Sequence, residues 1–74
     1  MNTDPKLKGF LKKIGANIRR LRASKGWTLE QTEEHGWSDW RQLQKIEAGK
    51  NITMATLWNV AKLLKVDPDE LLRD

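Results

Sequence analysis

The sequence predicts an all-α fold of five helices within one domain of 74 residues. Apolar residues recur three and four positions apart through most of the chain, which is the spacing of amphipathic helices, and no stretch shows a strand signal. Helix-capping residues and glycines stand at the ends of the same stretches. A chain of this length is near the lower limit for a domain that buries its own core.

The first helix is expected over about residues 6–24, after a loose tail at residues 1–5. Gly9 and Gly15 lower its intrinsic propensity by about 1 kcal/mol each relative to alanine, so packing must hold it. A basic amphipathic helix could also lie on anionic lipid, but the amphipathic helices that follow favour a core position. Its apolar face comprises Leu7, Phe10 or Leu11, Ile14, Ile18 and Leu21.

A second helix is expected over about residues 29–35. Thr28 is suited to cap its start, and Gln31 stands three residues later as the partner in a capping box. Trp27 precedes the cap as a hydrophobic staple, and Gly36 marks the end of the helix. A tight glycine-containing turn then leads into the next helix, and the two together predict a helix-turn-helix over about residues 28–48.

The third helix, at about 39–48, is the one around which the chain is organised. Ser38 or Asp39 can cap it, and Gly49 is suited to ending it. Its seam of buried apolar residues is thin, and its other faces carry long donor side chains that suit base edges and phosphates. We interpret it as a recognition helix. The donors are Arg41, Gln42, Gln44 and Lys45.

Two further helices complete the prediction. Thr53 caps the fourth, whose apolar face is widened by Val60 and Leu63 beyond a single stripe. Asp67 and Pro68 begin the fifth, with a cap and a proline at its first position. Both therefore contribute to the core.

Charge is distributed unevenly along the chain. Residues 1–26 carry a net charge of +7, residues 27–40 carry −4, residues 41–50 carry +2 and residues 51–74 carry −1. Basic surface is thus concentrated on the first and third helices. This arrangement suits a molecule with one face for a polyanion.

The composition argues against an enzyme. There is no cysteine for a disulfide or thiolate metal site, no tyrosine, and His35 is the only histidine and is expected at the surface. No paired-carboxylate, phosphate-loop or metal-ligand spacing is present, so no catalytic residue, metal or cofactor is expected. With no signal peptide and no apolar run long enough to span a membrane, a cytoplasmic protein without a membrane partner is expected.

In these features the chain resembles the phage-repressor-like (Xre/Cro-type) helix-turn-helix domains over about residues 14–72. The resemblance implies a five-helix, lambda-repressor-like domain of bacterial or phage type, which binds operator DNA, usually as a symmetric dimer, and regulates transcription. The matching pieces are Ile14-Gly15, Ile18-Arg19, Leu21-Arg22, Gly26-Trp27-Thr28, the run from Leu43 to Lys50, Thr56-Leu57, Val60-Ala61, Leu64 and Val66.

The resemblance also assigns roles to residues near the recognition helix. Trp40 and Arg41 take places where such repressors insert side chains into DNA, and Lys45 takes a third base-facing place, flanked by Gln42 and Gln44. The remaining candidates for DNA contact are Ser38 before the helix, Thr28 as a phosphate-binding helix start, and Lys50, Asn51 and Thr53 in the following loop.

Two more features follow from the family pattern. Arg22 and Glu47 occupy positions of a buried ion pair, which we interpret as structural because an unpaired buried charge is costly. Leu29 stands where family members often have glutamine, so a polar contact at that place is weakened or absent.

The chain departs from the family pattern in the turn. Aligned without gaps, Glu33 would lie on the core face, where burial is expensive. A helix one residue shorter and a turn one residue longer avoid this, and Trp37 then fills the core between the second and third helices. Trp40 could touch DNA or complete the core beside Leu43, and the second alternative is favoured.

The function expected from these patterns is sequence-specific DNA binding, as a transcriptional repressor that reads an inverted repeat. An antitoxin-like module that uses the same fold against a protein partner is an alternative, and non-specific binding to nucleic acid or membrane is a third. A homodimer is expected because Trp58, Leu63 and Leu72 exceed what one small core can bury.

Overall fold

A computed structural model describes residues 4–73, and these residues form helices and no strand. The elements in order are α1 (Pro5–Ser24), η1 (Glu30–His35), α2 (Trp40–Glu47), α3 (Met54–Leu64) and η2 (Pro68–Leu71). The all-helical prediction is confirmed. The prediction of five α-helices is not, because η1 and η2 are 3-10 helices.

Local hydrogen bonding explains why η1 is wound more tightly than an α-helix. The Thr32 N–H donates to the Leu29 carbonyl over 3.1 Å, and the Thr32 hydroxyl donates to the same carbonyl over 2.6 Å. Gly36 then ends the segment in the left-handed region at φ +105°. The segment η1 has only six residues, and hydrogen bonds between residues three positions apart are typical of such short 3-10 helices.

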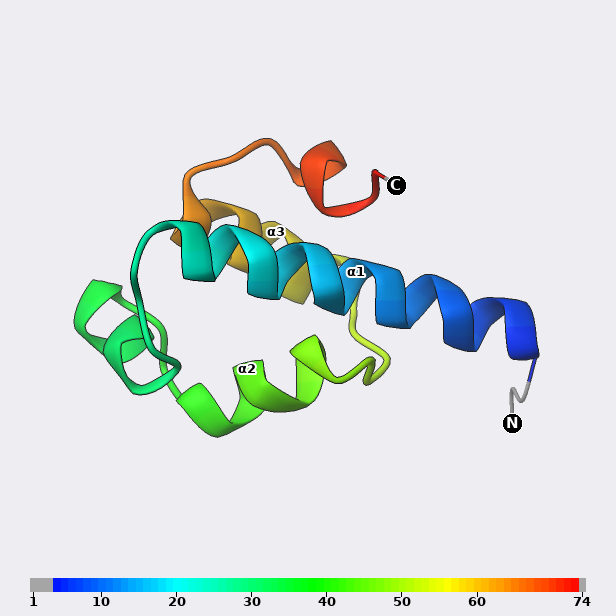
Figure 1. Ribbon diagram of the computed structural model, residues 1–74, viewed down its shortest axis with the longest axis horizontal. Coiled ribbons are helices and arrows are strands. Elements are labelled where there is room, and N and C mark those ends of the chain that lie inside the picture. The colour runs from blue at the N-terminus through cyan, green and yellow to red at the C-terminus, as the bar shows by residue number, and fades with distance from the viewer. Residues whose placement is uncertain (1–3, 74) are drawn as a thin grey trace.

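The long helix α1 organises the other elements (Figure 1). It contacts α2, α3 and η2, and its N-terminal turns project beyond the rest of the fold in Figure 1. Pro5 is its first residue, and the Asp4 carboxylate caps it by accepting from the Lys6 N–H at 2.9 Å. The loose tail expected at residues 1–5 is therefore wrong for Pro5, while residues 1–3 lie outside the described residues.

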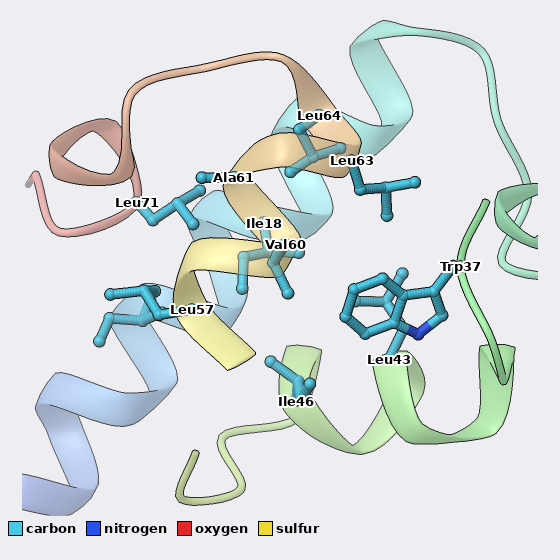
Figure 2. Packing of buried hydrophobic residues seen from close by; sticks show 11 residues of the cluster. Ile18, Trp37, Leu43, Ile46, Leu57, Val60, Ala61, Leu63, Leu64 and Leu71 are labelled. Atoms are coloured by element: carbon cyan, nitrogen blue, oxygen red, sulfur yellow. The ribbon is translucent and has the colours of Figure 1, made fainter. Parts of the chain in front are cut away.

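The core lies between α1, α2 and α3 and is closed by Leu71 of η2 (Figure 2). Trp37 is 9% exposed, as expected from the lengthened turn, and its ring lies between α2 and α3. Leu63 is 8% exposed and belongs to this core, so the expectation that the monomer could not bury it is wrong. The buried apolar residues are Ile14, Ile18, Trp37, Leu43, Ile46, Leu57, Val60, Ala61, Leu63, Leu64 and Leu71.

Two packing features hold α1 against its neighbours, and the sequence did not predict either of them. The backbone of α1 at Gly15 approaches the end of α2 so closely that an added Cβ would lie 2.7 Å from the Ile46 carbonyl oxygen. On another side of α1, the buried Asn17 amide donates to the carbonyls of Leu71 at 3.0 Å and Arg73 at 2.6 Å. The first contact fixes α2 and the second fixes the C-terminal segment.

Candidate nucleic-acid interface

Two carboxylates fix the start of α2. Asp39 is the N-cap, and its side chain accepts from the Arg41 N–H at 2.9 Å, so Ser38 does not act as the cap. The Glu33 carboxylate of η1 accepts from the Trp40 N–H at 2.9 Å. Glu33 is exposed, which avoids the burial cost anticipated from its sequence position. Glu33 of η1 and the N-cap Asp39 thus accept hydrogen bonds from the first two backbone amides of α2, which have no partner within the helix.

The turn between η1 and α2 is held by Trp37. Its backbone N–H donates to the Thr32 carbonyl over 3.1 Å, and its indole Nε1–H donates to the Asp39 carbonyl over 3.0 Å. The buried ring therefore connects the core to the residue that caps α2. This places the start of α2 relative to the core.

The outward side of α2 carries the predicted donors, but it does not present them as a single row. Leu43 and Ile46 are 0% and 2% exposed and anchor the opposite side of the helix. Arg41, Gln42, Gln44 and Lys45 are all exposed.

Two surface grooves flank this outward side and separate the two glutamines. Gln42 lines a groove of about 480 Å³ that it shares with Thr56 and Asn59 of α3. Gln44 lines the other groove, of about 310 Å³, together with Arg19 of α1 and Ala48. The glutamines therefore face different neighbours on either side of α2.

Trp40 does not complete the core. It is half-buried, and it is absent from both the buried cluster and the apolar residues packed against that cluster. The Arg41 guanidinium lies 4.9 Å from the centre of its ring, within the range of a cation–π contact. The favoured core position for Trp40 is therefore wrong.

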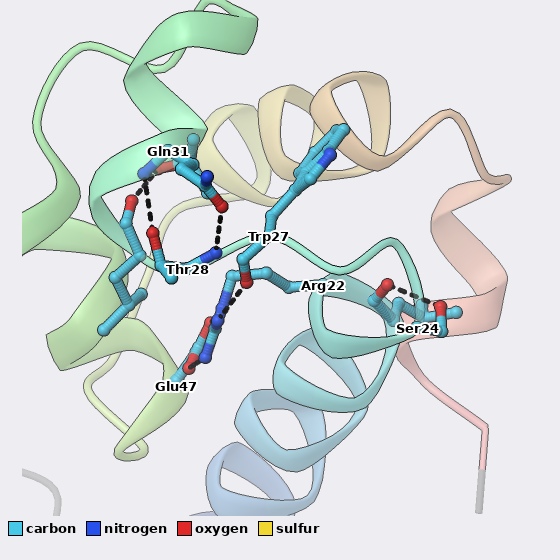
Figure 3. Close-up of polar contacts among 9 residues, drawn as sticks. Arg22, Ser24, Trp27, Thr28, Gln31 and Glu47 are labelled. Atoms are coloured by element: carbon cyan, nitrogen blue, oxygen red, sulfur yellow. Dashed lines mark hydrogen bonds and ion pairs between the residues drawn. The ribbon is translucent and has the colours of Figure 1, made fainter.

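Other predicted DNA contacts are engaged in capping. The Thr28 N–H donates to Gln31 Oε1 at 2.8 Å and the Gln31 N–H donates to Thr28 Oγ1 at 3.2 Å, which is the predicted capping box (Figure 3). The Thr28 amide is thus already satisfied within the protein. Thr53 caps α3 by accepting from the Thr56 N–H at 3.0 Å. In the same loop, Lys50 and Asn51 are exposed.

The predicted pair of Arg22 and Glu47 is present, and it links α1 to the end of α2 (Figure 3). Arg22 Nε and Nη2 donate to the two carboxylate oxygens of Glu47 over 2.7 and 3.0 Å. Arg22 Nη1 donates to the Trp27 carbonyl over 2.7 Å, so the guanidinium also holds the segment before η1. The side chains are 12% and 8% exposed. Hydrogen bonding to Glu47 raises the pKa of Arg22 above its ordinary value, while burial opposes that shift.

His35 is exposed, as expected, and its ring stacks on Trp27 with 3.8 Å between ring centres. The tryptophan expected as a staple thus packs on the last residue of η1. Within residues 4–73, no group of three His, Cys, Asp or Glu side chains is placed to hold a metal ion.

A helix-turn-helix family model of the Cro/C1 type matches residues 18–71 of this chain, which cover η1, α2 and α3. The chain therefore belongs to this helix-turn-helix family, whose members are DNA-binding regulators rather than catalysts. No curated protein and no solved structure matches the chain significantly. Over the described part of the chain, no helix has the length and apolarity that crossing a membrane requires.

Proposed function

We propose that this protein is a sequence-specific transcriptional repressor that reads an inverted-repeat operator through α2. The observation that carries the proposal is that exposed donor side chains stand on a helix that is anchored in the core and capped at its start. Arg41 and Lys45 stand on a helix whose other side is buried and whose start is capped by Asp39 and Glu33. Base readout requires such preorganised side chains, because a specific contact depends on hydrogen bonds of defined geometry.

Three of the four donors, and Trp40 beside them, have roles that their chemistry supports. Arg41 suits bidentate contact with the O6 and N7 edge of a guanine, and Lys45 suits a guanine edge or a phosphate. Gln44 suits adenine and lies on the groove that faces α1. Trp40 orients the Arg41 guanidinium by stacking, and its exposed edge suits a thymine methyl or a sugar.

Dimerisation is part of the proposal. Trp58 is 59% exposed and Met54 is 74% exposed, one helical turn apart on α3, and Leu72 is 37% exposed. Leu63 has no part in this surface because it is buried. Burial of such side chains against a second copy would relate two α2 helices by a twofold axis, with centres about 34 Å apart on successive turns of DNA.

Selection from a random duplex pool at near-physiological salt tests the function. Recovery of a short inverted repeat is expected, with one half-site for each protomer. Recovery of no motif, with binding that disappears as salt rises, would contradict the proposal and reduce the basic surface to a generic polyanion site.

Lys50→Ala is expected to weaken binding to all sequences about equally. Lys50 is an exposed cation in the loop after α2, and loss of one phosphate contact lowers the slope of log K against log salt by about 0.9. Titration of the selected operator and an unrelated duplex at several salt concentrations measures both effects. An unchanged slope would remove Lys50 from the backbone contacts.

Trp58→Glu is expected to shift the protein toward the monomer, because a carboxylate would be desolvated at the proposed interface. Sedimentation at high micromolar concentration, with and without the selected operator, measures the mass. The control for the mass of the free protein is Asn59→Glu, which adds a carboxylate at the neighbouring exposed position of α3; it is not used with the operator, because Asn59 shares a groove with Gln42. A parent that sediments as a monomer both free and on the operator would overturn the proposed dimer.

A further inference from the structure

We infer that one side of α1 forms a second contact surface for the DNA backbone, made of Lys8, Lys12 and Arg19. We call these three residues the α1 basic stripe. The inference rests on the proposed function, because it adds a backbone contact beside the base-reading helix. Two of the three residues lie outside the segment, residues 18–71, that matches the helix-turn-helix family.

Helical geometry places the stripe on the side of α1 that faces α2. Gly15 defines that side, because its backbone lies against the Ile46 and Glu47 carbonyls. At about 100° of rotation per residue, Lys8, Lys12 and Arg19 all fall within about 60° of Gly15 around the helix. The stripe therefore runs alongside α2 and the loop that follows it.

Two contacts near the C-terminal end of α2 support this placement. Lys12 lies against the loop that carries Lys50, since an added Cβ at Gly49 would be 3.0 Å from Lys12 Cγ. Arg19, about two turns further along α1, lines the same groove as Gln44 of α2 and its C-cap Ala48, which are both exposed. The stripe is thus continuous with the surface proposed to meet DNA.

The charges on this side favour an anionic partner. Lys8, Lys12 and Arg19 are exposed, and within residues 4–73 no carboxylate forms an ion pair with any of them. Glu47 lines the groove and is held by Arg22 through two hydrogen bonds, and Glu30 acts on Arg22 electrostatically. The stripe therefore retains its positive charge for a ligand.

The length of the stripe fits a stretch of DNA backbone. Arg19 stands eleven positions after Lys8, which corresponds to about 16 Å along the helix axis. One DNA strand carries a phosphate about every 3.4 Å of duplex axis, so the stripe spans roughly five phosphates. A duplex that enters the α2 surface can continue along α1, whose N-terminal turns project past the loop after α2 (Figure 1).

Leu29 forms an apolar part of the groove at the Arg19 end of the stripe. The residue is half-buried and packs on the core, and it lines the groove with Arg19 and Gln44. Its side chain offers no polar group there. Arg19 supplies a cation at the same groove, so a phosphate seated there gains an ionic contact.

Two triple variants with equal changes in charge test the inference. Lys8→Gln/Lys12→Gln/Arg19→Gln removes the stripe, and Lys6→Gln/Arg20→Gln/Lys25→Gln removes three exposed cations at other positions of α1 and its C-cap. Lys6 is two residues from Lys8 and therefore lies about 200° away around the helix. Binding to the selected operator is measured at several salt concentrations, after circular dichroism has shown that each variant is folded.

The stripe variant is expected to lower the salt slope by about 2–3, which corresponds to three phosphate contacts, and to leave the selected base preferences unchanged. The control variant Lys6→Gln/Arg20→Gln/Lys25→Gln is expected to lower the salt slope by less than about one. Equal slopes for the two variants, or a stripe variant with the parent's slope, would overturn the inference. So would a stripe variant that binds phosphatidylserine vesicles more weakly than the parent but keeps the parent's slope on DNA.

The outcomes separate this inference from the proposed function. If the parent protein selects no sequence motif from the random pool, the proposed function is wrong, whatever the salt slopes of the variants are. A parent with a motif whose stripe variant keeps the full slope defeats the inference alone. If Lys12→Gln disturbs folding through the contact with Gly49, Lys8→Gln/Arg19→Gln replaces the triple variant, with an expected fall in slope of about 2.

Discussion

Replacing Arg22 by methionine is expected to lower the free energy of unfolding on the order of 3 kcal/mol. The substitution leaves the Glu47 carboxylate, 8% exposed, without its two hydrogen bonds and leaves the Trp27 carbonyl without a donor. A charge retained at a nearly buried site without a partner is more costly than the pair itself is stabilising. Urea denaturation at neutral pH measures the loss.

A second substitution distinguishes loss of pairing from loss of packing. Arg22→Met/Glu47→Leu replaces both charges by apolar groups, and it is expected to recover part of the stability lost in the single variant. Arg73→Ala breaks an exposed pair with Asp69 and is expected to leave the unfolding transition unchanged. A single Arg22→Met variant as stable as the parent would show that the pair does not hold α1 to α2.

Replacing Gly15 by alanine is expected to destabilise the fold by about 1–3 kcal/mol, although alanine is the better helix former. The added Cβ would meet the Ile46 carbonyl oxygen at 2.7 Å and the Glu47 backbone, and neither can move without moving α2. Binding to the operator should weaken as well, because the recognition helix would be displaced from its position on α1. Urea denaturation and operator titration measure the two effects.

Gly9→Ala is the matched control for this substitution. Gly9 lies in the same helix, and a Cβ added there meets nothing within 4 Å. Its replacement is expected to stabilise the protein by up to about 1 kcal/mol, because only the helix propensity changes. Stabilisation by both alanines would contradict the close approach of α1 to α2 at Gly15.

Much of the fold follows from local sequence. The capping box at Thr28 and Gln31, the cap at Thr53 and the proline at the start of η2 depend on residues close together in the chain, and all three are present. The buried Trp37 also followed from local reasoning, since a turn one residue longer is the arrangement that keeps Glu33 out of the core. Patterns of this kind need no knowledge of distant partners.

The features that the sequence did not predict depend on contacts between distant segments. Asn17 bonds to Leu71 and Arg73, and nothing around Asn17 in the sequence indicates those partners. Gly15 was interpreted as a weak point of a helix, whereas its lack of a side chain permits the approach of α2. The burial of Leu63 likewise depends on how three helices meet.

The sequence predicted which residues form the candidate site better than it predicted how they are arranged in space. The exposed donors of α2 were all identified, because a helical pattern with a thin apolar seam leaves the remaining positions outside. Their division by two grooves depends on α1 and α3, which the pattern of α2 does not contain. The half-buried position of Trp40 outside the core was not predicted, because its helical spacing from Leu43 and Ile46 is that of a core residue.

Base reading by the outward face of α2 is tested by Arg41→Ala on the selected operator. Affinity is measured for the parent and the variant on the operator and on duplexes carrying each substitution at the half-site positions. Arg41→Ala is expected to lose about 1–3 kcal/mol of binding free energy and to lose discrimination at one base pair, while Arg73→Ala keeps the parent's preferences. An Arg41→Ala protein with the parent's preference at every position would contradict base reading by Arg41.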